Sequence, residues 1–315
     1  MARLLGDLVA YRATGTGHME LLAVYWMSPQ MYLINIIAIV PFVILFISGI
    51  SRTCSWLNVL VEIVGVLIRG YYGGQLLTAI GADANNHIFP IAYAIVESEN
   101  KDSWKWFLEL LQDDVGDHAA NGFNLMSDMQ KGLIPAVKDI MPGAHHRFCA
   151  MHIYQNFRKQ WPDLEMKAAM WACSKATTPQ DFEQAMGRVK RINQHAWEYL
   201  NKIPPQQWPR SHFSEYPKVD FYTNNNCETF NGKIKKMRGK PIITMLEEVR
   251  GYVMRILARN KKALVGYHGR ITPVQQSRLE REKKESNYWR PFPSGDEDGN
   301  VYEVQRLPVK VMAAY

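Results

Sequence analysis

The feature that most constrains the fold is a strand–helix–strand pattern in residues 123–152, with an acidic residue after the first strand. Residues 123–126 form a short apolar run that ends just before Asp128. Apolar residues then recur three and four positions apart, which is typical of an amphipathic helix, and Pro142 marks the following turn. A second strand is predicted to carry residues 149–152. Asp128 would then lie at the carboxyl end of a strand, where open α/β sheets bind their ligands.

Similar patterns elsewhere predict further strands and helices. Short apolar runs rich in β-branched residues predict strands, and apolar residues with a period near 3.6 predict helices. Thr178 followed by Pro179 has the pattern of a capped helix start. Strands are predicted at 59–68, 76–83, 89–96 and 301–304, and helices from Ser103, at 164–176, at 179–192, from Ala196 and at 243–259.

A long uncharged run lies near the start of the chain. Residues 21–51 contain no charged side chain, and residues 31–50 are predominantly apolar. Twenty helical residues would span about 30 Å, the thickness of the hydrocarbon core of a bilayer. The run lacks the basic region and small-residue cleavage site of a signal peptide. A membrane anchor and a buried segment are therefore the two alternatives.

Charge is distributed unevenly along the chain. The net charge is +7, and residues 229–290 alone hold 16 Lys and Arg against 5 Asp and Glu. This excess predicts a polyanionic partner, with nucleic acid first and an anionic membrane surface second. A solvated helical face is the alternative, because Lys and Arg are ordinary surface residues.

The order of the predicted elements is that of an RNase H-like domain, in which three carboxylates converge on two divalent metal ions. The motifs that make a family resemblance specific are YYGGQLLTAIGADANNHIFPIAYAIVESENKDSWKWFLELL (71–111), SDMQKGLIPAV (127–137), HHRFCAMHIYQNFRK (145–159), KATTPQDFEQAM (175–186), NNNCETFNGKI (224–234) and RGKPIITMLEEVR (238–250). With these motifs, the chain from about residue 64 to residue 262 resembles plant Mutator-like element (MULE) transposases.

The resemblance implies an α/β fold, namely an RNase H-like mixed sheet with flanking helices. An all-helical insertion would interrupt it before the last catalytic helix. The implied segments are an unassigned N-terminal part at 1–55, the first part of the core at 56–160, the insertion at 161–222, the final catalytic helix with a basic helix at 223–262, and a tail at 263–315 that stops before a zinc finger.

The resemblance also implies DNA cleavage and strand transfer that depend on Mg²⁺ (or Mn²⁺), with Asp128 and Glu228 as the second and third acids. Such ions take hard oxygen ligands, and they activate the nucleophile and stabilise the leaving oxygen. Glu228 also fits the first turn of a helix capped by Asn. The first acid position holds Val64, which cannot bind a metal. Glu62, on the same face of the strand, and Asp83, at the end of the next strand, are weak substitutes.

Cys149 and His152 match a further signature of the family. Their spacing suits zinc, but a zinc site needs four ligands and only one such pair is visible. We therefore expect these two residues to pack or to form hydrogen bonds, and we expect no zinc cofactor.

A basic run follows Glu228 and is predicted to contact the phosphate backbone of DNA, which would make affinity depend on salt. Its members are Lys233, Lys235, Lys236, Arg238 and Lys240. The resemblance implies DNA at transposon ends as the partner, a homo-oligomer and a nuclear location. A membrane would be a partner only through residues 31–50.

Three functions fit these observations. The first is a MULE transposase catalytic-domain protein that is inactive because Val64 replaces the first acid. The second is a domesticated, non-catalytic DNA-binding and transcription-regulatory protein of the far-red-response regulator type. The third is a membrane-anchored fragment that uses residues 31–50.

Overall fold

The computed structural model describes residues 9–13, 19–25, 33–39, 42–48, 60–69, 73–83, 85–115, 124–214, 219, 221–293, 295 and 302–307, and for the first four ranges only the backbone. The chain divides into two compact units. One comprises Met1–Ala82 and Ile88–Arg259, and the other comprises Asp83–His87 and Asn260–Tyr315.

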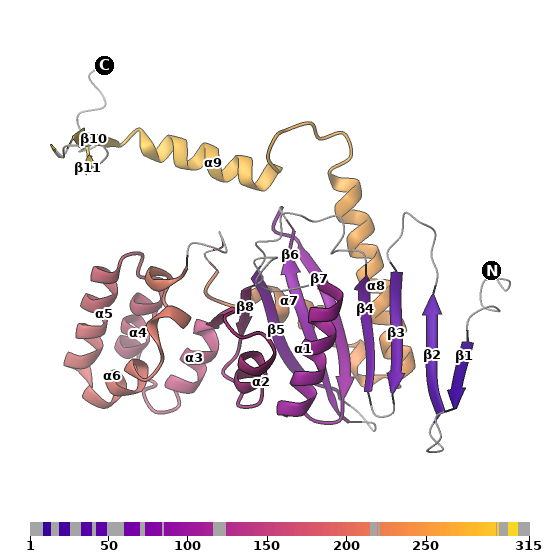
Figure 1. The fold of residues 1–315 in the computed structure, drawn as a ribbon. Helices are drawn as coiled ribbons and strands as arrows, with labels where there is room; N and C mark the ends of the chain where they lie inside the picture. Colours follow the sequence, from indigo (N-terminus) through magenta and orange to yellow (C-terminus); the bar gives the residue numbers. More distant parts are fainter. Residues whose placement is uncertain are drawn as a thin grey trace. The chain divides into compact units, whose positions relative to one another are not determined.

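The first unit contains a mixed sheet whose central strands follow the predictions closely (Figure 1). Its strands β5 to β9 are Leu60–Leu67, Gln75–Ala82, Ile88–Val96, Asn124–Ser127 and His145–Phe148. In the order β7-β6-β5-β8-β9, the pairs β7–β6 and β6–β5 are antiparallel, and the pairs β5–β8 and β8–β9 are parallel. The central strands read as near-continuous apolar runs because both of their faces are covered.

Four further strands extend this sheet beyond β7. They are β1 (Val9–Ala13), β2 (Met19–Tyr25), β3 (Leu33–Ile39) and β4 (Phe42–Ser48), and β4 pairs antiparallel with β7. The described parts of the run 31–50 are thus two strands, and a single membrane-spanning helix is wrong for them. Across the ranges with a described backbone, no helix has both the length and the apolar character needed to cross a membrane.

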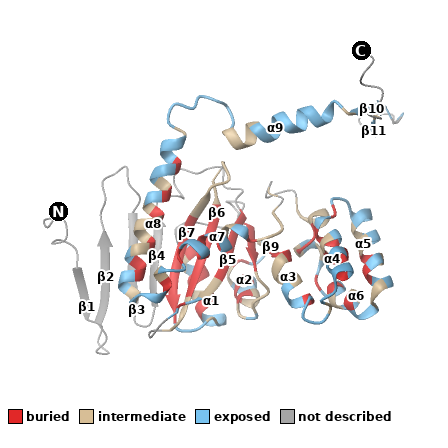
Figure 2. Ribbon diagram, turned by 180° about the vertical axis from the view of Figure 1, so that it is seen from behind, coloured by how far each residue is buried: buried red, intermediate tan, exposed pale blue. Residues whose placement is uncertain are grey.

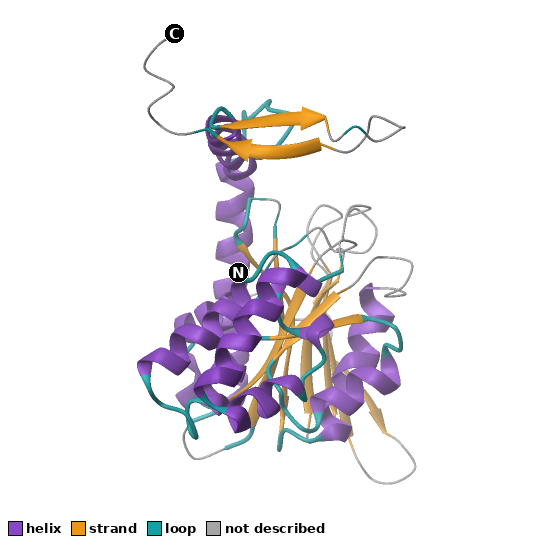
Figure 3. Cartoon of the chain, turned by 90° about the vertical axis from the view of Figure 1, so that its left-hand side faces the viewer, coloured by secondary structure: helices purple, strands orange, loops and turns teal. Residues whose placement is uncertain are grey.

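Helices cover the two faces of the central strands (Figures 2 and 3). On one face, α1 (Lys101–Val115) and α2 (Leu133–Ile140) share a core with the odd-numbered residues of β5 and β6. On the other face, α7 (Asn225–Lys233) and α8 (Ile242–Ala263) pack on the even-numbered residues. The period of two along each strand produces this division. The predicted apolar face of the first helix is confirmed, because Trp104, Phe107, Leu108 and Leu111 are fully buried.

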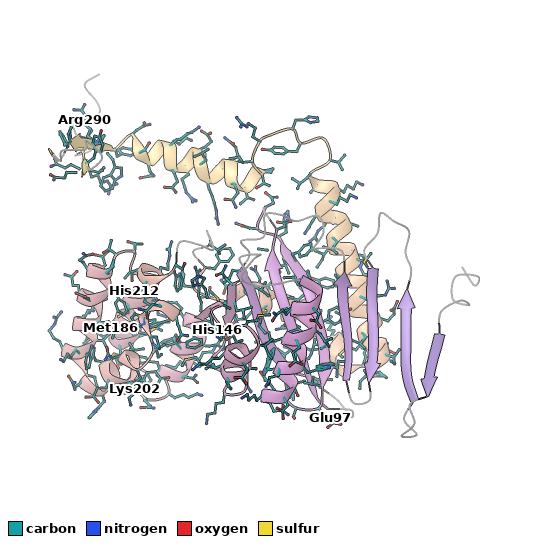
Figure 4. All side chains as sticks on the ribbon, in the orientation of Figure 1. Glu97, His146, Met186, Lys202, His212 and Arg290 are labelled. Carbon is teal, nitrogen blue, oxygen red and sulfur yellow. The ribbon has the colours of Figure 1, made fainter. Side chains whose placement is uncertain are left out.

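A helical region separates β9 from α7 and has its own core. It contains α3 (Ala150–Phe157), α4 (Leu164–Lys175), α5 (Pro179–Ile192), α6 (Gln194–Asn201), and the short 3₁₀ helices η1 (Pro205–Gln207) and η2 (Arg210–His212). Met186 is one of its buried residues (Figure 4). The predicted start of α5 is confirmed: the Thr178 hydroxyl accepts a hydrogen bond from the Asp181 N–H at 3.1 Å.

The second unit contains α9 (Pro273–Ser286) and a hairpin of β10 (Trp289–Pro293) and β11 (Tyr302–Arg306). The predicted strand at 301–304 therefore falls largely within β11. A turn at 83–87 belongs to the same unit, and its Asn85 Oδ1 accepts a hydrogen bond from the Val274 N–H at 2.9 Å.

Candidate active site

The register of β5 and β8 brings the first two predicted acid positions together. The strands run parallel, and Ile63 pairs with Ser127 at the end of β8. The next residues are Val64, still within β5, and Asp128, just past the end of β8, so the two positions are neighbours where β8 ends. Adjacent strands lie about 4.8 Å apart. Val64 is buried and packs in the core beneath α7.

Asp128 lies just beyond the end of β8, as predicted. Burial raises the pKa of its carboxyl, while the nearby His152 imidazole and a hydrogen bond from the Gln130 N–H oppose that rise. The strand end is held by Ser127, whose hydroxyl is 2.7 Å from His146 Nε2. Desolvation lowers the pKa of His146 to about 4, so this imidazole is neutral near pH 7.

Glu228 lies in the first turn of α7, as predicted, and its side chain is exposed. It is close enough to Glu62 to raise the pKa of that carboxyl slightly. The predicted Asn cap is wrong in one respect. Asn224 occupies the N-cap position, but its side chain accepts no hydrogen bond from the helix backbone. Asn224 Oδ1 instead accepts a hydrogen bond from the Cys149 thiol at 3.0 Å.

Glu62 supplies the cap that α7 lacks locally. Its side chain is only 1% exposed. One carboxylate oxygen accepts a hydrogen bond from the Cys227 N–H at 2.9 Å, and the other accepts one from Asn226 Nδ2 at 2.8 Å. The first turn of a helix leaves N–H groups without partners, and a carboxylate there is also favoured by the helix dipole. Burial nevertheless dominates and raises the pKa of Glu62 to about 7.

Asp83 has a different local role. It belongs to the second unit, where it holds the turn that precedes β7 in the sequence. Asp83 Oδ1 accepts hydrogen bonds from the backbone N–H groups of Asn85 at 2.9 Å and His87 at 2.8 Å. Its other oxygen is 2.9 Å from His87 Nδ1. These contacts account for both carboxylate oxygens of Asp83.

Glu99 is an acid of this region that the sequence reasoning missed. A Cβ atom on Gly65 would lie 2.6 Å from the Glu99 Cδ atom, so the carboxyl group rests directly against this glycine. Burial and then the nearby Asp128 carboxylate raise the pKa of Glu99 to about 7. A glycine inside a strand often marks a close approach of another group, and Gly65 was the available signal.

Cys149 and His152 do not lie on a strand, so that prediction is wrong. The strand β9 ends at Phe148, Cys149 is the N-cap of α3, and His152 lies in the helix. Ile153 and Phe157, four residues apart, bury the inner face of α3. As expected, Cys149 forms hydrogen bonds: beyond the one to Asn224 Oδ1, its sulfur accepts one from the Asn224 N–H at 3.3 Å. Burial raises the pKa of Cys149 to about 11, which favours the protonated thiol that donates to Asn224.

The side chains present do not fit a two-metal site. Among the residues with described side chains, no group of three His, Cys, Asp or Glu is placed to hold a metal ion. Val64 offers no ligand atom, and both carboxylate oxygens of Glu62 are committed to α7. Asp128 and Glu228 are the remaining predicted ligands, and Mg²⁺ prefers a nearly complete octahedral set of oxygens.

Comparison with known families identifies part of this region. Residues 69–156 match the family model of the MULE transposase domain. The match runs from just after β5 into α3, so it includes Asp128, Cys149 and His152, whereas Val64 and Glu228 lie outside it. It supports a transposase of the MULE type for this part of the chain. No curated protein matches the chain.

The basic run at residues 233–240, which follows Glu228, contains three kinds of residue. Lys233, Lys235 and Lys236 are exposed. Lys240 forms an ion pair with Glu248. Arg238 is buried, and its guanidinium donates hydrogen bonds to backbone carbonyls. The Arg238 side chain is thus already used inside the protein, and its predicted contact with DNA stays a prediction.

Proposed function

We propose that this chain is a MULE transposase catalytic-domain protein with an RNase H-like core. Its ancestral reaction would be Mg²⁺-dependent DNA cleavage and strand transfer at transposon ends. The family match over residues 69–156 supports this assignment. The mixed sheet, with Asp128 at the end of a parallel strand, is compatible with it. From the same resemblance we propose a nuclear location and a homo-oligomer.

We further propose that the present chain does not cleave DNA. The observation that carries this proposal is the apolar side chain of Val64, next to Asp128 across two parallel strands. Two-metal catalysis requires carboxylates on both ions, because they must hold the attacking and the leaving oxygen in line. Glu62 cannot supply the missing group from its present position, because α7 holds both of its oxygens.

The test is a nicking assay on supercoiled plasmid DNA with Mg²⁺ or Mn²⁺. The unmodified chain is expected to leave the plasmid intact, and Val64→Asp is expected to nick it. The matched control is Val64→Asn, because Asn has the shape of Asp but no charge, and it should not nick the plasmid. A double variant, Val64→Asp with Asp128→Asn, should not nick it either. Circular dichroism establishes that each variant is folded. The double variant gives the background level of nicking. Nicking by the unmodified chain above that level would show that the proposed inactivity is wrong.

A non-catalytic DNA-binding regulator is the second candidate. The exposed Lys233, Lys235 and Lys236 favour it, because backbone contact with DNA needs cations and no metal site. Folded Val64→Asp protein that binds DNA but never nicks it would favour this candidate over the first. For the third candidate, a membrane-anchored fragment, β3 and β4 provide no support, and recovery of the expressed protein in the soluble fraction would remove it.

A further inference from the structure

A buried arginine ties the turn after α7 to the end of β5. Arg238 lies in the 3₁₀ helix η3 (Met237–Gly239) and is 9% exposed. Its guanidinium donates to the Leu67 carbonyl at 3.2 Å and to the Asn231 carbonyl at 3.5 Å. The Arg238 carbonyl in turn accepts a hydrogen bond from the Arg69 N–H at 2.9 Å. Two segments that are far apart in sequence therefore form one corner: Arg238 and Leu67 are separated by 171 residues.

Among the described side chains, the cations at this corner have no acidic partner. In the part of the chain with described side chains, no carboxylate forms an ion pair with Arg69 or Arg238. Burial, and then the positive charge of Arg69, lower the pKa of Arg238. Arg238 Nε is buried without a hydrogen-bond partner. Burying a charge without a counter-ion is costly, and two like charges side by side add to that cost.

Two exposed lysines enlarge this positive region. Lys235 and Lys236 precede Arg238 by three and two residues, in the segment that the buried guanidinium holds in place. Neither forms an ion pair with another described residue, whereas Lys240 in the same turn is neutralised by Glu248. The uncompensated charge is thus concentrated where η3 meets the end of β5.

We propose that Arg69, Lys235 and Lys236 form a phosphate-binding corner for the DNA backbone, and that Arg238 is the positioning residue that holds it. The corner deepens the proposed function and rests on it, since its ligand is DNA. Phosphates supply the negative charge that the surrounding protein lacks. Arg69 presents a fork that can bind two phosphate oxygens, and the lysines act as point charges.

The corner would bind the DNA backbone within a few nucleotides of the reacting position. Arg69 lies five residues after Val64. At about 3.3 Å per residue this separates them by at most about 17 Å. That distance corresponds to about five nucleotides, at about 3.4 Å of helix rise each. Contacts at such a distance fix the register of the duplex and carry no sequence information.

The test measures binding of a fluorescent 30-base-pair duplex to the full chain by anisotropy, at several salt concentrations. Each phosphate contact contributes about 0.9 to the slope of log affinity against log salt. The triple variant Arg69→Ala, Lys235→Ala, Lys236→Ala should reduce the magnitude of the slope by about two to three. A matched triple variant, Lys159→Ala, Arg191→Ala, Lys202→Ala, removes one Arg and two Lys from exposed positions of the helical region and should change the slope by less than about one.

Arg238 is tested separately, because its role is indirect. Arg238→Met should reduce the slope by at least about one, and Arg238→Lys should recover part of that loss by restoring the cation. Should Arg238→Met fail to fold, the triple variant alone decides. An unchanged slope in the triple variant, with DNA binding otherwise intact, overturns the corner and leaves the proposed function standing. Absence of DNA binding by the unmodified chain at every salt concentration overturns both.

Discussion

Replacement of Glu62 by Gln is predicted to change how the stability of the fold depends on pH. Burial raises the pKa of this carboxyl from 4.5 to about 7. The folded state therefore holds the proton more tightly than the unfolded state does. The contribution of Glu62 to stability is fully present below pH 4.5, decreases as the pH rises, and is lost above about pH 7.

The size of this effect follows from the same pKa. Moving a pKa from 4.5 to about 7 corresponds to about 3 kcal/mol. Glutamine has the shape of the protonated acid and does not titrate. The unfolding free energy of Glu62→Gln minus that of the unmodified chain should therefore increase by about 3 kcal/mol as the pH rises from 4.5 to 7. At pH 8 it should be at least as stable as the unmodified chain.

The assay is urea denaturation followed by circular dichroism at half-unit pH intervals from 4 to 8. Comparing each variant with the unmodified chain at the same pH cancels the contribution of other groups, including Glu99. Glu183→Gln is the control, because this side chain is exposed on α5, and its difference from the unmodified chain should stay constant. Glu62→Ala should be less stable throughout, because it leaves the Cys227 N–H without a partner. A constant difference between Glu62→Gln and the unmodified chain across this pH range would refute the reasoning.

Substitutions at three further positions test hydrogen bonding and packing by urea denaturation at neutral pH. Cys149→Ala should lower the unfolding free energy by about 1–3 kcal/mol, because it leaves the buried Asn224 N–H and Oδ1 unpaired. Cys149→Ser should keep most of that stability. Equal stability of the two variants would contradict the hydrogen-bonding role. Gly132→Ala should cost about 1–3 kcal/mol, because its Cβ would lie 2.7–2.8 Å from backbone atoms of residues 100 and 101. Gly187→Ala, in the middle of α5 with only the tip of a side chain nearby, should instead stabilise by up to about 1 kcal/mol, and a loss there would count against the packing argument.

Elements that depend on local sequence were predictable. The start of α5 follows from Thr178, because its capping hydroxyl and the Asp181 N–H that donates to it are only three residues apart. The inner face of α1 follows from the spacing of its four apolar residues. Both signals act within two turns of chain, so no knowledge of distant neighbours is required.

Short apolar runs were less informative. The run 31–50 has enough apolar residues for a membrane helix, but its described parts are β3 and β4, two strands paired with each other. Residues 149–152 are predicted to lie on a strand, yet β9 ends at Phe148 and Cys149 is already the N-cap of α3. Periodicity does not separate a short strand from a short buried helix, because both can present only apolar residues to their neighbours.

The roles of Glu62 and Arg238 depend on contacts that no local pattern contains. The period of two places Glu62 on the same face of β5 as Val64, and this part of the prediction agrees with the structure. Its partner Cys227, however, arrives from 165 residues away. Backbone groups of α7 and β5 form hydrogen bonds with these charged side chains. The docking of α7 onto the sheet therefore removes Glu62 from the acids available at the site. It follows that position 64 is where a single substitution can add a carboxylate beside Asp128 without uncapping the helix that carries Glu228.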